Sequence, residues 1–579
     1  MRKNDSISRL RNLALAAALC SAGMALAQGP ITYVPQGSSW NAAARADFYT
    51  RDQGSRLIPL PWARALKAPD GQPFLADTLG RYGYLRNPAN PAGLPVGFMA
   101  GAAVAGRQDL AMNCSACHTR QIVANGREYR IDGGPAIVDF GGLLTDLDSA
   151  VGRVLDDPAE FASFASAVLG ANPSPAGMAA LRAEVQAWYL REHAMITRAV
   201  DGAGWGLGRL DAVSMIFNRV TGLDIGPPPS FLIEGNIRRA DAPVRYPFLW
   251  NSPRQDRTQW PGFAQNGNDL LGLARNLGQV YGVYGHFQPR RVGNRVDFTG
   301  TNSANFTNLG KLEGLVKKIG APRWPFPINR SLAAQGEKIF KRDWSQGGCA
   351  DCHGERRGAF RFTLQPTWAT PLCDVGTDSR QYAILARTAS TGVYEGARRP
   401  GGPPLPAETK AFDLLAVSVV GSIFQHTFGF SLFGYANSGA PEAAPSAAQT
   451  ELSQRILSTY SPPPADACDE KPDAADFTFK YESRVLRGIW ATAPYLHNGS
   501  VPSLADLLTP GTARPNRFRI GRNYDLARVG LAEDQGSAAP ERDTTCEHRT
   551  SGNSRCGHDY GTALSTSEKA ALLEYLKGI

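Results

Sequence analysis

The chain has 579 residues, which is too long for a single hydrophobic core, so two or more domains are expected. Hydrophobic residues make up 43% and charged residues 20% of the sequence, the composition of an ordinary globular protein. The formal net charge of +9 is spread without any run of basic and aromatic residues, so the sequence does not favour a nucleic-acid-binding protein. No internal run reaches about 18 apolar residues, so no membrane-spanning segment is expected after the leader.

The N-terminus has the three parts of a secretory signal peptide. An apolar stretch begins at residue 13, and Ala25-Leu26-Ala27 provides a cleavage site of the small-x-small type. The positive start that precedes them is formed by Arg2, Lys3, Arg9 and Arg11. Residues 1–27 are therefore predicted to be removed, and the mature protein is expected in the periplasm or outside the cell.

Two copies of the motif Cys-x-x-Cys-His, at 114–118 and 349–353, carry the strongest chemical signal. Two thiols three residues apart on one turn can each add to a vinyl group of one porphyrin, and the next residue presents an imidazole to the iron. A zinc half-site or a redox dithiol is the alternative, but no second cysteine pair stands at zinc-finger spacing. The sequence predicts two covalently bound c-type haems, with thioether and iron-ligand residues Cys114, Cys117, His118, Cys349, Cys352 and His353.

Between and after the motifs, a few segments have clear periodicity. Residues 158–202 are predicted to be helical, and residues 224–310 to be rich in loops. A linker is expected at 323–330, followed by a helix from about Ser331 that leads into the second motif. Residues 412–424 form another apolar helix candidate, and 437–449 a loop rich in Ala, Pro and Ser. Ser565 and Glu568 form a capping box that opens a closing helix.

Four cysteines remain outside the motifs once the leader is removed. An oxidising compartment makes two disulfides plausible, and Cys546 with Cys556 would close a short loop. That pairing would leave Cys373 with Cys468, although four cysteines allow three pairings and the sequence does not choose among them.

Three further stretches, together with the two motifs, resemble a known family. They are residues 242–250 with Gln259-Trp260 shortly after, residues 272–280, and the long stretch 488–504, which contains Pro494-Tyr495-Leu496-His497-Asn498-Gly499. The chain is similar to the dihaem c-type oxygenases and peroxidases that include the bacterial rubber oxygenases. It is also similar to the fatty-acid dioxygenases and diol synthases of pseudomonads.

The resemblance implies a mainly α fold with long irregular loops, in which two cytochrome c-like haem domains pack together. The expected boundaries are 28–325 for the first domain and 326–579 for the second. His118 and His353 would be the proximal ligands, and His497 the sixth ligand of the second haem. A haem with two imidazole ligands has no open site and passes electrons, so the first haem would keep an open face for oxygen or peroxide.

The distal face of the first haem has no assigned catalytic residue. Aromatic side chains in the family-like stretch are candidates for an apolar pocket, although core packing explains them equally well. They are Phe248, Trp250, Trp260 and Phe263, with His286 as a rival distal group.

The leading hypothesis is a periplasmic dihaem oxygenase that acts with oxygen on an unsaturated lipid, most simply a fatty acid such as oleate. The reaction would be dioxygenation to a hydroperoxide or isomerisation of that hydroperoxide to a diol. A dihaem peroxidase that takes electrons from a small redox protein is the alternative. Cleavage of polyisoprene and pure electron transfer are further alternatives, and binding of carbon monoxide would exclude the last of these. The choice of substrate rests on family analogy.

Overall fold

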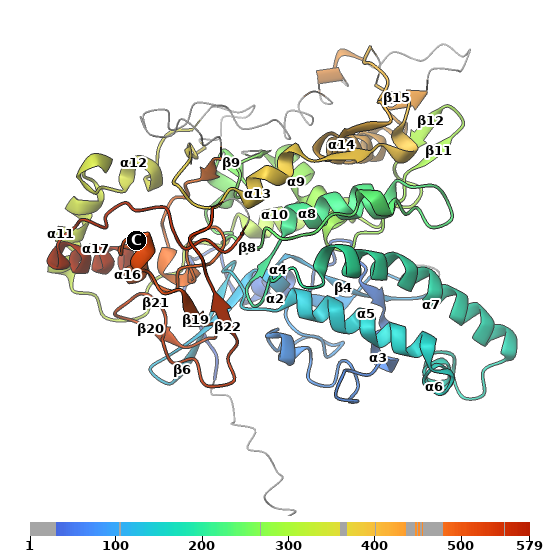
Figure 1. The fold of residues 1–579 in the computed structure, drawn as a ribbon, viewed down its shortest axis with the longest axis horizontal. Coiled ribbons are helices and arrows are strands. Elements are labelled where there is room, and N and C mark those ends of the chain that lie inside the picture. The colour runs from blue at the N-terminus through green and yellow to red at the C-terminus, as the bar shows by residue number, and fades with distance from the viewer. Residues whose placement is uncertain are drawn as a thin grey trace, which may run out of the picture.

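The computed structural model describes residues 30–579 except 104–105, 267, 359–366, 400, 436–445, 449, 452–453, 455–478 and 549–550 (Figure 1). The predicted signal peptide, the predicted loop at 437–449 for the most part, and Cys468 lie outside the described residues.

Helices dominate the regular structure of the described residues. The predicted helix at 158–202 is present but is divided into α6, α7 and a π-helical turn at Ile196–Val200, and a second π-helical segment covers Asn218–Asp224. The predicted helices near 331 and 412 are confirmed as α11 and α14. The loop-rich reading of 224–310 is wrong over α9, where Asn268 caps a 14-residue helix. The helices are α2 (Ala42–Thr50), α3 (Leu60–Ala65), α4 (Cys114–Cys117), α5 (Phe140–Asp156), α6 (Pro158–Leu169), α7 (Pro175–Met195), α8 (Ala212–Phe217), α9 (Asp269–Gly282), α10 (Phe306–Val316), α11 (Arg330–Phe340), α12 (Ala350–His353), α13 (Arg380–Ala383), α14 (Ala411–Phe428), α16 (Leu504–Leu507) and α17 (Thr566–Gly578).

Short strands form nine small sheets within the described part of the chain, so the prediction of a mainly α fold with irregular loops is wrong. Most of the predicted loops are tied together in ladders of two or three residues, which are too short for alternation to show in the sequence. Three sheets have more than two strands. They are β1-β6-β5 (Thr32–Tyr33, Arg127–Asp132, Thr119–Ala124), β2-β4-β3 (Ile58–Pro59, Asp109–Met112, Phe98–Ala100) and β11-β12-β17-β15 (Arg290–Val292, Arg295–Asp297, Gly434–Tyr435, Ala397–Arg398).

The remaining sheets are pairs of strands. One of them, β13-β18, joins segments more than a hundred residues apart in the sequence. The pairs are β7-β8 (Arg209–Leu210, Val244–Arg245), β9-β10 (Arg257–Thr258, Ala264–Gln265), β13-β18 (Leu372–Cys373, Tyr481–Glu482), β14-β16 (Thr388–Ser390, Glu408–Lys410), β19-β22 (Arg517–Arg519, Glu541–Asp543) and β20-β21 (Tyr524–Asp525, Gly530–Leu531).

A buried carboxylate anchors the sheet that follows the first Cys-x-x-Cys-His motif. Asp132, at the end of β6, accepts hydrogen bonds from Trp40 Nε1 at 2.8 Å, Arg45 Nε at 2.7 Å and the Tyr49 hydroxyl at 2.5 Å. Because β5 begins at Thr119 and pairs with Asp132, this network fixes the strand that leaves His118. A fully partnered buried charge of this kind rigidifies its surroundings.

The C-terminal helix closes the structure by packing across the helix before the second motif. The predicted capping box is confirmed, since Ser565 and Glu568 bond reciprocally at the start of α17. Helices α11 and α17 lie side by side (Figure 1) and cross closely at Gly336. The apolar core beneath them also includes Val34, close to the other end of the described chain. The predicted domain boundary at 325/326 stays a prediction.

Helix α14 is the one element, among the residues described, that is long and apolar enough to cross a membrane by length and composition. Of the 18 residues of this helix, 72% are buried in the structure. Side chains from nearly every position of the helix contribute to a core that includes Tyr281 and Phe298. A packed core helix therefore accounts for its composition.

Candidate functional site

The second Cys-x-x-Cys-His motif forms the single turn α12, which follows α11 after a short connection. The Nδ1 of His353 donates a 2.8 Å hydrogen bond to the carbonyl oxygen of Arg484. Burial lowers the pKa of His353, so the ring is neutral and its Nε2 is left for a metal. A backbone carbonyl at the far nitrogen is the usual way in which proteins fix the tautomer and orientation of a ligating histidine.

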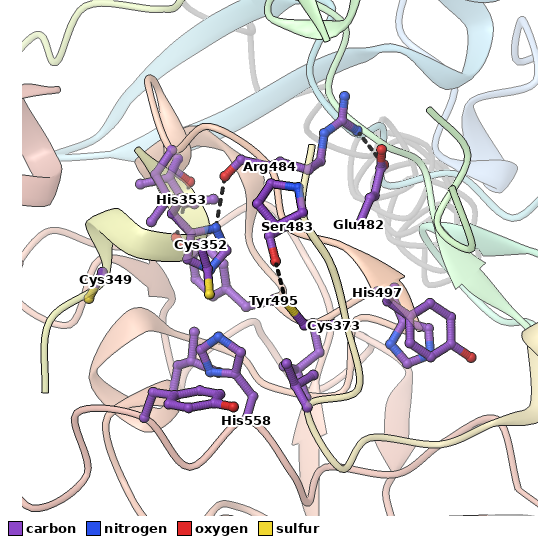
Figure 2. Close-up of a pocket in the computed structure, with 18 of the residues that line it drawn as sticks. Cys349, Cys352, His353, Cys373, Glu482, Ser483, Arg484, Tyr495, His497 and His558 are labelled. Atoms are coloured by element: carbon purple, nitrogen blue, oxygen red, sulfur yellow. Dashed lines mark hydrogen bonds and ion pairs between the residues drawn. The ribbon is translucent and has the colours of Figure 1, made fainter. Parts of the chain in front are cut away.

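A cavity of about 690 Å³ opens beside this motif. Figure 2 shows Cys352 and His353 on its wall, with Tyr495, His497 and His558 on other sides of it. The volume lies within the usual range for cofactor sites, and apolar side chains form much of the wall, as a porphyrin face requires. Its leucine, isoleucine and valine residues are Val375, Leu486, Ile489, Leu496, Leu504, Leu507, Leu508, Leu572 and Leu576. The residues present therefore fit a haem attached at Cys349 and Cys352.

The motif cysteines are available for thioether bonds. Cys114, Cys117, Cys349 and Cys352 form no disulfide. Burial raises the pKa of Cys114 and of Cys349 to about 11, so these thiols are neutral in the protein without haem.

The described cysteines outside the motifs are disulfide-bonded in the structure. The predicted disulfide between Cys546 and Cys556 is confirmed. Cys373 is also disulfide-bonded, and its predicted partner Cys468 lies outside the described residues. Among the described cysteines, those outside the motifs form disulfides and those of the motifs do not.

His497, the predicted sixth ligand, lines the same cavity and is buried. Its ring stacks on Tyr481 with centroids 4.1 Å apart, and its Nε2 lies 3.3 Å from a carboxylate oxygen of Asp378. Asp378 also accepts a hydrogen bond from Asn498 at 2.8 Å. The imidazole is thus packed between Tyr481 and a nearby carboxylate, and its role as an iron ligand stays a prediction.

His558 is a second imidazole at this cavity that the sequence did not single out. Its ring centroid lies 6.0 Å from that of His353, and both rings border the cavity (Figure 2). The adjacent disulfide at Cys556 anchors the loop, and His558 takes a left-handed backbone conformation with φ +52°. Only its place among the six histidines outside the motifs could have suggested it.

The first motif forms the turn α4, whose Asn113 cap accepts a hydrogen bond from the Ser115 amide at 2.9 Å. Burial lowers the pKa of His118 to about 4, so this imidazole is also neutral. The Pro247 carbonyl opposes that shift, although Nδ1 makes no hydrogen bond within ordinary limits. The Tyr246 ring lies 6.1 Å from the His118 ring. The prediction of a haem at the first motif therefore stays a prediction.

The four aromatic residues considered for the first distal pocket do not gather in one place. Phe248 and Trp260 line the cavity of the second motif, and Trp250 stacks on Phe248 at 4.9 Å. Phe263 packs edge-on against Phe412 in a separate core. The rival group, His286, has a solvent-exposed side chain.

One segment of the cavity wall is similar in sequence to a known protein family. Residues 480–519 match the family model described as "RoxA-like, cytochrome c-like". This segment contains Arg484, Tyr495 and His497, all of which border the cavity. The match supports a haem cofactor at this cavity and suggests a haem-dependent oxidoreductase.

The match also corrects the predicted architecture. It is confined to 40 residues that contain neither Cys-x-x-Cys-His motif. The expectation of two packed cytochrome c-like domains is therefore wrong. The long-range strand pairs described above replace the self-contained helical domains that were expected.

Two relatives come from Sinorhizobium fredii (strain NBRC 101917 / NGR234). The chain is 27% identical over 610 residues to "Uncharacterized protein y4iJ", with 94% of this chain and 93% of the relative covered. It is 24% identical over 320 residues to "Uncharacterized protein y4iM", with 54% and 56% covered. Neither name states an activity, so the first relative supports similarity over nearly the whole length, the second over about half of it, and neither supports a reaction.

Proposed function

We propose that this protein is an exported dihaem c-type oxygenase that acts on an unsaturated hydrophobic substrate. The observation that carries the proposal is the cavity beside Cys349 and Cys352, where the Arg484 carbonyl orients His353 with Nε2 free. The first motif, with its buried neutral His118, would hold the first haem. The RoxA-like segment on the cavity wall favours oxygen chemistry over simple electron storage.

The protein groups contribute orientation, exclusion of water and a fixed charge environment. A bound haem supplies one-electron redox chemistry and, where one axial position is open, a site for a small oxidant. The Arg484 carbonyl holds the His353 ring, and the leucines of α16 and α17 keep the cavity wall apolar. The buried Arg484 and Glu482 side chains lie beside it, with Nη1 and Oε1 3.5 Å apart.

The substrate follows from analogy with the resembled oxygenases, and an unsaturated fatty acid such as oleate is the first choice. We expect purified protein to consume oxygen with oleate and to yield hydroxylated or hydroperoxy products, measured with an oxygen electrode and mass spectrometry. Polyisoprene is the second substrate to try. The matched variant, with serine at all four motif cysteines, should consume none.

Two outcomes would redirect the proposal. Rapid turnover of hydrogen peroxide with a reduced small cytochrome, without oxygen uptake on any lipid, would make the protein a peroxidase. If the reduced protein failed to bind carbon monoxide, both irons would be six-coordinate and an oxygenase would be excluded.

Replacing a histidine at the cavity should identify the sixth ligand. If His497 ligates, His497→Gly should convert the second haem from low to high spin, while His558→Gly should leave its spectrum unchanged. The reverse pattern would give the role to His558, whose ring faces His353. Optical and electron paramagnetic resonance spectra distinguish the two states. His193, half exposed and bonded to Asp148, provides a control that should change neither.

A further inference from the structure

Arg484 occupies an unusual place between the two Cys-x-x-Cys-His motifs. It follows β18 by two residues, and its backbone carbonyl is the hydrogen-bond partner of His353. Its guanidinium turns the other way, donating to the Phe248 carbonyl at 3.0 Å and to Gln255 Oε1 at 3.1 Å. One residue therefore contacts the second motif through its backbone and a different segment through its side chain.

The segment that receives the guanidinium is the one that contacts the first motif. Phe248 follows Tyr246 and Pro247, and the Tyr246 ring lies 6.1 Å from the His118 ring. The Arg484 guanidinium lies 4.3 Å from the centroid of the Phe248 ring, so it is held by a cation–π contact as well as by hydrogen bonds. Its positive charge also contributes to lowering the pKa of His118. The charge of Arg484 therefore acts on His118, while the backbone carbonyl of the same residue holds His353.

The charge of Arg484 is buried and has one acidic partner at hand. The side chain is 5% exposed, and its Nη1 lies 3.5 Å from Oε1 of Glu482, whose side chain is fully buried. Charges act over longer distances in a protein interior than at the surface, because little solvent screens them. A change to either member of the pair should therefore change the electrostatic potential at both motifs.

We propose that Arg484 is a positioning residue shared by the two haem sites, and that the Arg484–Glu482 pair sets their reduction potentials jointly. The inference rests on the proposed function, because it requires a haem at each motif. Adding one electron converts a ferric haem into a ferrous haem with one positive charge less. A nearby cation therefore favours the reduced form, and a nearby anion disfavours it.

Redox titration of the purified two-haem protein tests this directly, with dithionite as reductant and the haem absorbance bands as readout. We expect Arg484→Gln to lower both midpoints, and Glu482→Gln to raise both. The expected change in the reduced-to-oxidised ratio at fixed potential is about tenfold, which corresponds to 59 mV for one electron. Arg484→Lys keeps the charge and the backbone carbonyl, so both midpoints should stay near those of the parent protein.

The control is Arg487→Gln, three residues further along. Arg487 is also paired with a glutamate, Glu355, but its side chain is 55% exposed, so solvent should screen the loss. Shifts of equal size in Arg484→Gln and Arg487→Gln, or a shift at one haem alone, would overturn the inference. If Arg484→Gln does not fold, Glu482→Gln still decides by the sign of its shift. Haem content is measured first: fewer than two haems in the parent protein refutes the proposed function, whereas two haems with unmoved midpoints refutes only the shared role of Arg484.

Discussion

Serine in place of Cys349 and Cys352 should leave the exported protein with half of its covalently bound haem. A c-type haem survives denaturation because thioether bonds hold it, and hydroxyl groups cannot form those bonds. The expected haem-to-protein ratio falls from two to one, measured by the pyridine haemochrome spectrum and by the mass of the denatured chain. The corresponding change at Cys114 and Cys117 should also leave one, and all four substitutions should leave none.

The disulfide cysteines provide the matched control for haem attachment. Cys546→Ser with Cys556→Ser removes a bridge from the same protein, at a cost of about 2–5 kcal/mol in stability. The covalent haem content should nevertheless stay at two. A parent protein with a single haem would contradict the dihaem proposal, and a quadruple motif variant that keeps covalent haem would contradict attachment at these motifs.

A side chain at Gly336 should destabilise the protein by about 3 kcal/mol, near the upper end of what overpacking usually costs. A Cβ atom on Gly336 would lie 1.9 Å from the Ala571 carbonyl oxygen and 2.8 Å from the Cβ of Tyr575. Backbone cannot move aside as a flexible side chain would, so α11 and α17 must separate in Gly336→Val. We expect a lowered unfolding midpoint in thermal and denaturant melts. The second haem should also be less well retained in its pocket, because Leu572 and Leu576 of α17 line the cavity.

Two other helical glycines show whether the close crossing is the cause. Gly310 and Gly314 lie in α10, and a Cβ at either would meet nothing within 4 Å. Gly310→Ala and Gly314→Ala should each be neutral or stabilising by about 0.5–1 kcal/mol, because alanine has the higher helix propensity. If Gly336→Ala were equally harmless, the helices would not be in the close contact described.

Local patterns in the sequence were enough to predict several elements of this fold. The capping box at Ser565 and Glu568 involves residues three apart, and the apolar helix around 412–424 shows its character within one window. The disulfide of Cys546 and Cys556 spans ten residues. Each of these features is decided by neighbours in the chain, so the sequence displays it directly.

Features decided by distant partners could not be predicted in this way. Strand β13 has two residues, and its partner β18 begins 108 residues after Cys373, at Tyr481. Two residues carry no visible alternation, so the pairing has no local signature and the sheets were missed. For the same reason, the family resemblance suggested helical domains, whereas the chain pairs segments that are far apart in the sequence.

The candidate site likewise contains residues that local sequence predicts and partners that only the fold brings together. His353 was predicted from its motif, whereas the carbonyl that orients it belongs to Arg484, 131 residues away. Every residue has a backbone carbonyl, so the identity of a residue does not show that its carbonyl is a hydrogen-bond partner. His558 was overlooked for a related reason, since a single histidine gains meaning only when the fold brings it beside another ring.

The way the cavity is assembled has a consequence for the order in which the protein matures. Its walls come from Cys349 and His353, from the 481–508 region, and from Leu572 and Leu576, near the last residue of the sequence. In a chain exported from its N-terminus, the motif thiols precede the more than two hundred residues that complete the wall. A haem attached at this stage would bind before the cavity is complete, and α17 would then pack over it.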